Sequence, residues 1–236
     1  MATKAKKRAA LTRERVLRSA VKLADRGGIE ALSMRRLGQE LGVEAMSLYN
    51  HVRNKEEILD GLVDVVFSEI ATPSADDDWV TAMRRRAVSA RQVLKRHPWA
   101  LGLLESRTRP GPANLRHHDS VLAALRTAGF SVEMAAHAYS LLDSYIYGFT
   151  LNELSLPLDT QEAVAGVAEQ ILEDNPAGAY PYLAEMAASI VMKPGYDYGD
   201  EYEYGLDLIL SGLTAMVPKR TLRVRSQKVS GQEAMR

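Results

Sequence analysis

The chain has 236 residues, of which 46% are hydrophobic and 25% are charged, and its basic and acidic residues balance to a formal net charge of zero. It contains no cysteine, which excludes disulfide frameworks, thiolate metal sites and cysteine nucleophiles. The basic first ten residues lead into no apolar signal segment, and no apolar run reaches the roughly 18 residues of a membrane span, so we expect an uncleaved cytoplasmic protein.

The zero net charge hides a segregation of charge along the chain. Residues 1–60 carry a net charge of +5, residues 61–217 carry −10, and residues 218–236 carry +5. A basic first segment on an acidic body is typical of a protein in which one end contacts nucleic-acid phosphates.

The spacing of apolar residues predicts an all-α fold. Every long segment has helical periodicity, and none shows the sustained alternation of a half-buried strand. After a basic, disordered arm at residues 1–10, Thr12 can cap a first helix. Gly27 and Gly28 should end that helix.

A short second helix, a tight turn and a third helix are expected next. Ser33 can cap the second helix, and Gly42 supplies the positive φ angle that the turn needs. The third helix is expected at residues 44–51. Asn54 and Glu57 have the spacing of a capping box at the start of a fourth helix, which should join this unit to the rest of the chain.

The stretch at residues 72–78 has one proline and three aspartates, which indicates a connection between two domains. Later helices are expected at residues 79–96, 99–107, 112–128, 131–154, 160–173, 180–192 and 201–217. The sequence thus predicts the arm, a small helical domain at residues 11–72, a larger helical bundle at residues 73–217 and a basic tail at residues 218–236.

The third expected helix is too short to be stable alone, so its outer face is informative. Leu48 and Val52 point inward, which leaves an outer face that is small, polar and aromatic. Such a face fits the major groove of DNA, because small residues permit close approach and serine or asparagine can hydrogen-bond to base edges. The outward residues are Ala45, Met46, Ser47, Tyr49, Asn50 and His51.

Residues beside this helix are suited to contacts with DNA. Arg35 can reach a guanine edge or a phosphate, and Ser33 can hydrogen-bond to a phosphate. Lys55 lies at the expected N-terminus of the next helix, where anions are favoured. Each of these residues, taken singly, also has a simpler explanation. Tyr49 can be a packing residue, His51 a helix C-cap and Lys55 a solvated charge.

The chain resembles the TetR family of bacterial repressors over about residues 11–70, most closely in SMRRLGQELGVEAMSLYNHVRNKEEILDGL. The resemblance implies that residues 11–72 hold a three-helix helix-turn-helix DNA-binding domain whose third helix enters the major groove, and that a homodimer binds a palindrome. By position, it implies base-facing roles for Arg35, Ala45, Met46, Ser47 and Asn50. It likewise implies phosphate contacts for Ser33, Tyr49, His51 and Lys55.

The resemblance also implies that the larger domain dimerises through its last long helices, and two segments have wide apolar faces suited to this. The first stripe consists of Ala138, Leu141, Leu142, Tyr145, Ile146 and Phe149. The second consists of Leu206, Ile209, Leu210, Leu213 and Val217, beside the small residues Gly205, Ser211 and Gly212. The alternative is that both segments are core helices of a monomer.

A ligand site should lie among polar and aromatic residues of the larger domain, where it would suit an apolar or aromatic effector with a few polar groups. The candidates are His97, Trp99, Tyr139, Asp143, Tyr147 and Met186, although core packing can explain each one singly. We expect no cofactor. We also expect no metal, because the neighbouring His117 and His118 point about 100° apart on a helix and cannot share a ligand face.

The sequence contains no phosphate loop, dinucleotide fingerprint, zinc-protease motif or nucleophile elbow, so we expect no enzyme. The cluster of His117, His118 and Asp119 is interpreted as a solvated helix face. The predicted function is a DNA-binding transcriptional regulator, a repressor that binds a palindromic operator and is released by a small hydrophobic or aromatic ligand. The alternatives are a ligand-independent architectural DNA-binding protein, a helical enzyme, or a regulator that activates.

Overall fold

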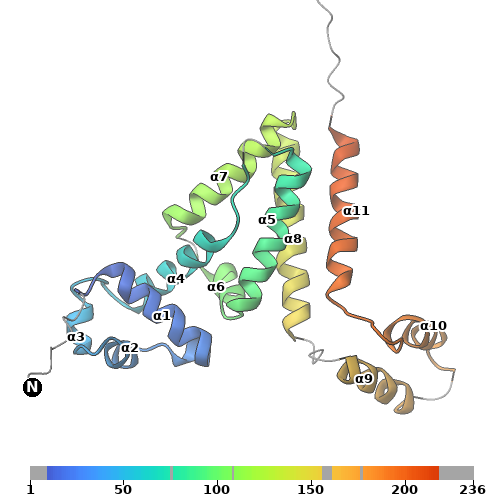
Figure 1. Ribbon diagram of the computed structural model, residues 1–236, viewed down its shortest axis with the longest axis horizontal. Helices are drawn as coiled ribbons and strands as arrows, with labels where there is room; N and C mark the ends of the chain where they lie inside the picture. The colour runs from blue at the N-terminus through green and yellow to red at the C-terminus, as the bar shows by residue number, and fades with distance from the viewer. Residues whose placement is uncertain (1–9, 75–76, 108, 156–160, 176–177, 218–236) are drawn as a thin grey trace, which may run out of the picture.

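The computed structural model describes residues 10–74, 77–107, 109–155, 161–175 and 178–217 (Figure 1). Within these ranges helices are the only regular secondary structure, which confirms the expected all-α fold. The expected basic tail, and all but Ala10 of the expected basic arm, lie outside the described residues.

The N-terminal unit contains α1 (Arg13–Gly27), a single 3₁₀ turn (Ile29–Ala31), α2 (Met34–Leu41), α3 (Ala45–Leu48) and α4 (Lys55–Glu69). The expected caps are confirmed, because side-chain oxygens of Thr12, Ser33 and Asn54 each accept a hydrogen bond from the backbone N–H three residues ahead. Gly42 ends α2 with a φ of 67°, in the left-handed region.

The third helix is shorter than the expected residues 44–51. Only Ala45–Leu48 is α-helical, and the chain continues in tight turns in which the N–H groups of His51 and Val52 both donate to the Leu48 carbonyl. Leu48 itself is fully buried, so it anchors this short helix to the core of the unit.

The turn between α2 and α3 also depends on Gly38, which the sequence did not single out. A Cβ atom on Gly38 would lie 2.9 Å from the Val43 carbonyl oxygen and 3.2 Å from the Ala45 nitrogen. Both neighbours are backbone atoms, so only glycine permits this close approach of the two helices.

The larger part contains α5 (Trp79–Arg96), α6 (Ala100–Ser106), α7 (Pro112–Thr127), α8 (Val132–Ser155), α9 (Gln161–Glu173), α10 (Pro181–Met186) and α11 (Asp200–Met216). The expected helix at residues 180–192 differs, because α10 passes into a π-helical turn at Ala187–Val191. In Figure 1, α5, α7 and α8 form a bundle with α11 alongside, whereas α9 and α10 lie apart from it.

Helix α4 joins the two parts, and polar contacts tie it to the connection between α6 and α7. Its Asp64 accepts hydrogen bonds from the backbone N–H groups of Ala113 and Asn114, at 2.7 and 2.9 Å, and thereby caps α7. Arg107, which follows α6, donates to Asp60 of α4 at 2.7 Å. Movement of the α6–α7 connection should therefore be transmitted to α4.

A second joint between the two parts is centred on the buried His97, at the end of α5. Its Nδ1 lies 2.6 Å from the Asp25 carboxylate of α1, and its Nε2 lies 3.2 Å from the Glu69 carboxylate of α4. Trp99 Nε1 donates to the same Asp25 oxygen at 2.8 Å. One side chain of the body thus contacts two helices of the N-terminal unit.

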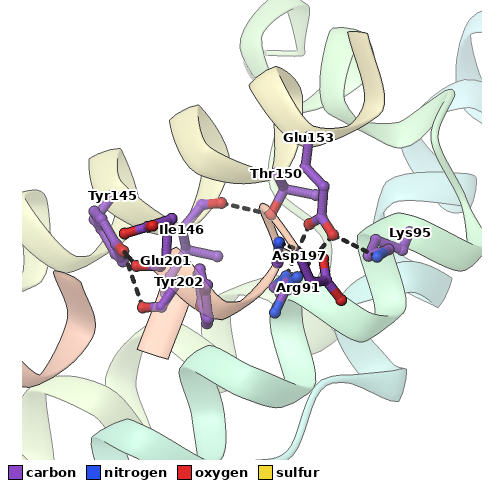
Figure 2. Close-up of polar contacts among 10 residues, drawn as sticks. Arg91, Lys95, Tyr145, Ile146, Thr150, Glu153, Asp197, Glu201 and Tyr202 are labelled. Atoms are coloured by element: carbon purple, nitrogen blue, oxygen red, sulfur yellow. Dashed lines mark hydrogen bonds and ion pairs between the residues drawn. The ribbon is translucent and has the colours of Figure 1, made fainter. Parts of the chain in front are cut away.

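Helix α11 is fixed to α5 and α8 by a cluster of aromatic and charged side chains (Figure 2). Arg91 of α5 makes two hydrogen bonds to Glu153 of α8, at 2.8 and 2.7 Å. Its guanidinium carbon lies 4.7 Å from the centre of the Tyr202 ring on α11, and the Tyr145 hydroxyl donates to the Tyr202 carbonyl oxygen at 2.9 Å. These contacts hold the start of α11 in place.

Candidate functional site

The first candidate site is the outer surface of α3 and its neighbours. Leu48 and Val52 are buried, as expected, which turns the other side chains of this segment outward. Met46 is 75% exposed and Tyr49 is 44% exposed, which is unusual for large apolar and aromatic side chains. The exposed candidates are Ser33, Arg35, Met46, Tyr49, Asn50 and Lys55, and the half-buried ones are Ala45, Ser47 and His51.

The turn that leads into α4 is held in shape by Glu57. Its carboxylate accepts a hydrogen bond from the Arg53 backbone at 2.8 Å and pairs with Arg13 of α1. The pKa of Glu57 is held below its usual value, chiefly by the backbone hydrogen bond from Arg53 and also by Arg13. Lys55, in the first turn of α4, is left exposed beside the outer face of α3.

The second candidate site is a cavity in the body. Its larger lobe, of about 480 Å³, is lined by Leu101, Gly102, Leu104, Tyr139, Ser140, Asp143, Ser144, Tyr147, Gly148 and Leu151. A smaller lobe of about 260 Å³ is lined by Val63, Phe67, Leu104, Arg107, Arg109, Pro110, Asn114, His118, Asp143 and Tyr147. Leu104, Asp143 and Tyr147 line both lobes, so the two lobes adjoin, and the larger one has a size that suits a small organic molecule.

A buried polar network lies beside this cavity. Arg86 of α5, whose side chain is 1% exposed, forms an ion pair with Asp143 of α8. Arg86 Nε also donates to His117 Nε2 at 2.9 Å, and the Tyr139 hydroxyl lies 2.8 Å from His118 Nδ1. The network connects α5, α7 and α8 through charge-assisted hydrogen bonds.

Burial sets the protonation of these groups. Desolvation, together with the positive charge of Arg86, lowers the pKa of His117 to about 4, so this imidazole is neutral at pH 7. Desolvation also lowers the pKa of His118. It raises the pKa values of Tyr139 and Tyr147, with a contribution from the charge of Asp143, so both phenols keep their protons.

The structure brings together only some of the expected ligand residues. Tyr139, Asp143 and Tyr147 line the cavity, whereas His97 and Trp99 belong to the joint with α1 and α4. Met186 lines a separate small hollow between α9 and α10. The three residues that line the cavity are spaced four residues apart and therefore share one face of α8. This spacing is a sequence signal that distinguishes them from the other three candidates.

Several lining residues carried no sequence signal, among them Leu101, Arg107 and Asn114, because distant elements bring them to the cavity. The interpretation of residues 117–119 as a solvated helix face was wrong in part. His117 is buried against Arg86, and His118 lines the smaller lobe. The reason is that α7 packs against both α4 and α8, which covers this side of the helix.

A third surface is an open apolar groove between α8 and α11, with a volume of about 600 Å³. Leu142 and Ile146 of the first expected stripe, and Leu206 and Leu210 of the second, are buried inside the body. Other apolar side chains on the same two helices are exposed. The groove is lined by Met134, His137, Leu141, Leu208, Ile209, Gly212, Leu213 and Met216.

Two further observations bear on function. Among the described residues, no three side chains of the metal-binding types are grouped so that they could hold an ion. Within the same part of the chain, every helix is too short or too polar to span a bilayer.

Comparison with known protein families identifies both parts of the chain. Residues 16–62 match the family described as bacterial regulatory proteins, tetR family. Residues 72–217 match the family described as tetracyclin repressor-like, C-terminal domain.

Individual relatives agree with this result over nearly the whole chain. The transcriptional repressor DrrR1 of Streptomyces coeruleorubidus is 32% identical over 89% of this chain and 80% of its own length. The class C tetracycline repressor of Escherichia coli is 32% identical, over 87% of this chain and 92% of its own length.

A solved structure of the TetR family protein ActR of Streptomyces coelicolor, in complex with actinorhodin, is similar to the present fold with a TM-score of 0.75. It is 30% identical in sequence and covers 89% of this chain and 100% of its own. The matches to both families agree with the individual relatives and with the helix-turn-helix geometry. The chain therefore belongs to the TetR family of bacterial transcriptional regulators, which bind DNA and are not enzymes.

Proposed function

We propose that this protein is a cytoplasmic repressor that binds a palindromic operator as a homodimer and is released when a small hydrophobic or aromatic molecule enters the cavity. The observation that carries this proposal is the contact between the cavity wall and α4. Arg107 and Asn114 line the cavity, and both residues also hydrogen-bond to acidic side chains of α4. Occupancy of the cavity can thus act on the helix that orients the N-terminal unit.

For DNA recognition, we propose that α3 enters the major groove, with Arg35, Ala45, Met46, Ser47 and Asn50 facing the bases. Ser33, Tyr49, His51 and Lys55 would contact the phosphates. The support for this assignment is the exposed outer face of α3 beside the exposed Lys55, on a segment of positive net charge.

We expect Tyr49→Ala and Lys55→Ala to weaken operator binding without unfolding the protein, since both side chains are exposed. Loss of the Lys55 charge should reduce the slope of log affinity against log salt by about 1, whereas loss of the neutral Tyr49 hydroxyl should weaken binding and leave the slope unchanged. Fluorescence anisotropy at several salt concentrations measures both quantities. The matched control is Arg116→Ala, an exposed cation of α7, and normal binding by both test variants would contradict the contact assignment.

For assembly, we propose that the groove between α8 and α11 packs against the same groove of a second copy, in a four-helix interface. We expect Leu208→Glu to convert the dimer to monomers, because Leu208 lines the groove and a charge there would be buried without a partner. Sedimentation measures the mass. Leu115→Glu, at an exposed leucine of α7, should remain dimeric, and a dimeric Leu208→Glu variant would rule out this interface.

For release, we propose a shift between two arrangements of the N-terminal units, only one of which matches the spacing of the operator half-sites. An effector can release DNA only if it binds the other arrangement more tightly. The described complex of ActR with actinorhodin is consistent with a small-molecule site in a relative of this chain.

The experiment that tests the whole proposal is a fluorescence-anisotropy titration of the protein against its own upstream DNA, with and without a panel of hydrophobic and aromatic compounds. We expect tight, salt-sensitive binding that one compound class relieves. Binding that no compound relieves would favour a ligand-independent architectural protein, and absence of binding to any upstream palindrome would overturn the proposal. Reporter expression with and without the protein distinguishes repression from activation.

A further inference from the structure

The smaller lobe of the cavity contains a positive charge that the protein leaves unmatched. Two arginines, Arg107 and Arg109, line this lobe. Arg107 donates to Asp60 at 2.7 Å and to Glu56 at 2.6 Å, so two carboxylates of α4 balance its charge. Arg109 is exposed, and within the described part of the chain no carboxylate or other group pairs with its guanidinium. Its charge and its N–H donors are therefore available to a ligand.

A buried amide lines the same lobe. Asn114, in the first turn of α7, is 9% exposed. Its backbone N–H donates to Asp64, whereas its side-chain amide hydrogen-bonds to no other group in the described ranges. A buried polar group without a partner costs free energy, and a ligand that hydrogen-bonds to the group recovers it. A second group of the lobe thus calls for a polar ligand atom.

Asp143 supplies the carboxylate among the described residues that line this lobe, and its charge is balanced inside the protein. It forms an ion pair with the buried Arg86 and accepts a hydrogen bond from the Tyr147 hydroxyl at 3.4 Å. Burial lowers the pKa of His118, so this imidazole of the lobe is neutral at pH 7.5. The unbalanced charge of the lobe is therefore the positive charge of Arg109.

The two adjoining lobes otherwise offer apolar surface from α4, α6 and α8. The side chains that supply it are Val63, Phe67, Leu101, Leu104 and Leu151. Such walls suit an aromatic or aliphatic body. A charged group of a ligand would lose its hydration among them without gaining a partner, so its place is beside Arg109.

We infer that the cavity selects an apolar acid, whose carboxylate pairs with Arg109 and accepts a hydrogen bond from the Asn114 amide while its aromatic or aliphatic body lies against the apolar walls. A guanidinium can hold a carboxylate through two parallel N–H···O hydrogen bonds. One unbalanced cation matches one negative charge, which favours a carboxylate over a phosphate dianion. The inference rests on the proposed function for the cavity and adds the charge of the effector to it.

The first test is calorimetric titration of the intact protein at pH 7.5 with 2-naphthoate and 2-naphthamide, which have the same aromatic body and differ in charge. We expect 2-naphthoate to bind about tenfold more tightly, a difference of about 1.4 kcal/mol, because its hydrogen bonds with Arg109 join two charged groups. The preference should shrink as salt is raised, since Arg109 is exposed and its charge is screened.

Three results of this titration would each overturn the inference: equal affinities, a preference for the amide, or no binding of either probe. Tighter binding of 2-naphthyl phosphate than of 2-naphthoate would overturn the choice of a carboxylate.

The second test removes the cation. Arg109→Gln keeps hydrogen-bond donors but loses the charge, so it should reduce the preference for 2-naphthoate over 2-naphthamide to about one. The matched control is Arg116→Gln, at an exposed cation of α7 that lines neither lobe, and it should keep the preference. An unchanged preference in Arg109→Gln, or an equal loss in both variants, would overturn the inference.

The third test removes the buried amide. Asn114→Ala should weaken both probes several-fold and leave their ratio unchanged, because the amide can donate to an oxygen of either one. Asn152→Ala, at an exposed asparagine of α8, is the control and should change neither affinity. Normal binding of both probes by Asn114→Ala would overturn the part of Asn114 in recognition.

The same titrations on operator-bound protein distinguish this inference from the proposed function. Release of DNA by both probes at equal concentrations would retain the ligand-released repressor and overturn only the requirement for a negative charge. Selective binding of 2-naphthoate to the free protein, with no release by any compound, would support the inference and contradict the proposed mode of release.

Discussion

Asp143→Ala is expected to lower the free energy of unfolding by about 3–5 kcal/mol, because it leaves the charge of Arg86 buried without a partner. The Arg86 side chain is 1% exposed, so water cannot replace the missing carboxylate. Its Nη1 already lacks a hydrogen-bond partner, and the variant would add a second unmatched group. Urea denaturation at fixed protein concentration measures the loss.

The matched control removes both charges. Arg86→Met combined with Asp143→Leu should be much less destabilised than Asp143→Ala, because well-packed apolar residues can replace a buried ion pair at little cost. A free energy of unfolding of Asp143→Ala within about 1 kcal/mol of that of the parent protein would contradict the buried ion pair.

Gly38→Ala is expected to reduce operator affinity at least tenfold. The new Cβ atom would lie 2.9 Å from the Val43 carbonyl oxygen, and this backbone cannot move aside as a flexible side chain can. The gain of about 1 kcal/mol that alanine brings to an ordinary helix position is outweighed by overpacking of about 1–3 kcal/mol and by displacement of α3. Fluorescence anisotropy measures the affinity, and circular dichroism measures the fold.

Gly166→Ala is the control, because Gly166 also lies in a helix and nothing within 4 Å would meet its Cβ atom. It should leave operator binding unchanged and leave stability the same or slightly higher. Normal operator binding by Gly38→Ala would mean that α2 and α3 are not as closely packed as the structure has them.

Local signals in the sequence predicted much of the N-terminal unit. The caps at Thr12, Ser33 and Asn54 and the left-handed turn at Gly42 follow from the chemistry of single residues and their immediate neighbours. The outward face of α3 follows in the same way from the inward positions of Leu48 and Val52. The length of α3 did not follow, because tertiary contacts decide how far so short a helix continues.

The cavity was only half predictable. Tyr139, Asp143 and Tyr147 line the cavity as expected, and they share one face of a single helix, so their spacing of four residues is a signal that the sequence itself carries. His97 and Trp99 have the same polar and aromatic character, yet they contact Asp25, which lies more than 70 positions earlier in the chain. Composition alone cannot distinguish a side chain in a cavity from one in an interdomain joint.

The sequence by itself determined the helical class, the helix starts and the turn geometry of the N-terminal unit, because these depend on residues within a few positions of one another. The tertiary structure alone decided that Arg86 meets Asp143, that His117 is buried, and that the cavity wall is tied to α4. Arg86 lies 31 positions from His117 and 57 positions from Asp143 in the chain. Such contacts depend on which of several similar helix faces pack together. Periodicity identifies an apolar face, but the packing of the whole chain selects its partner.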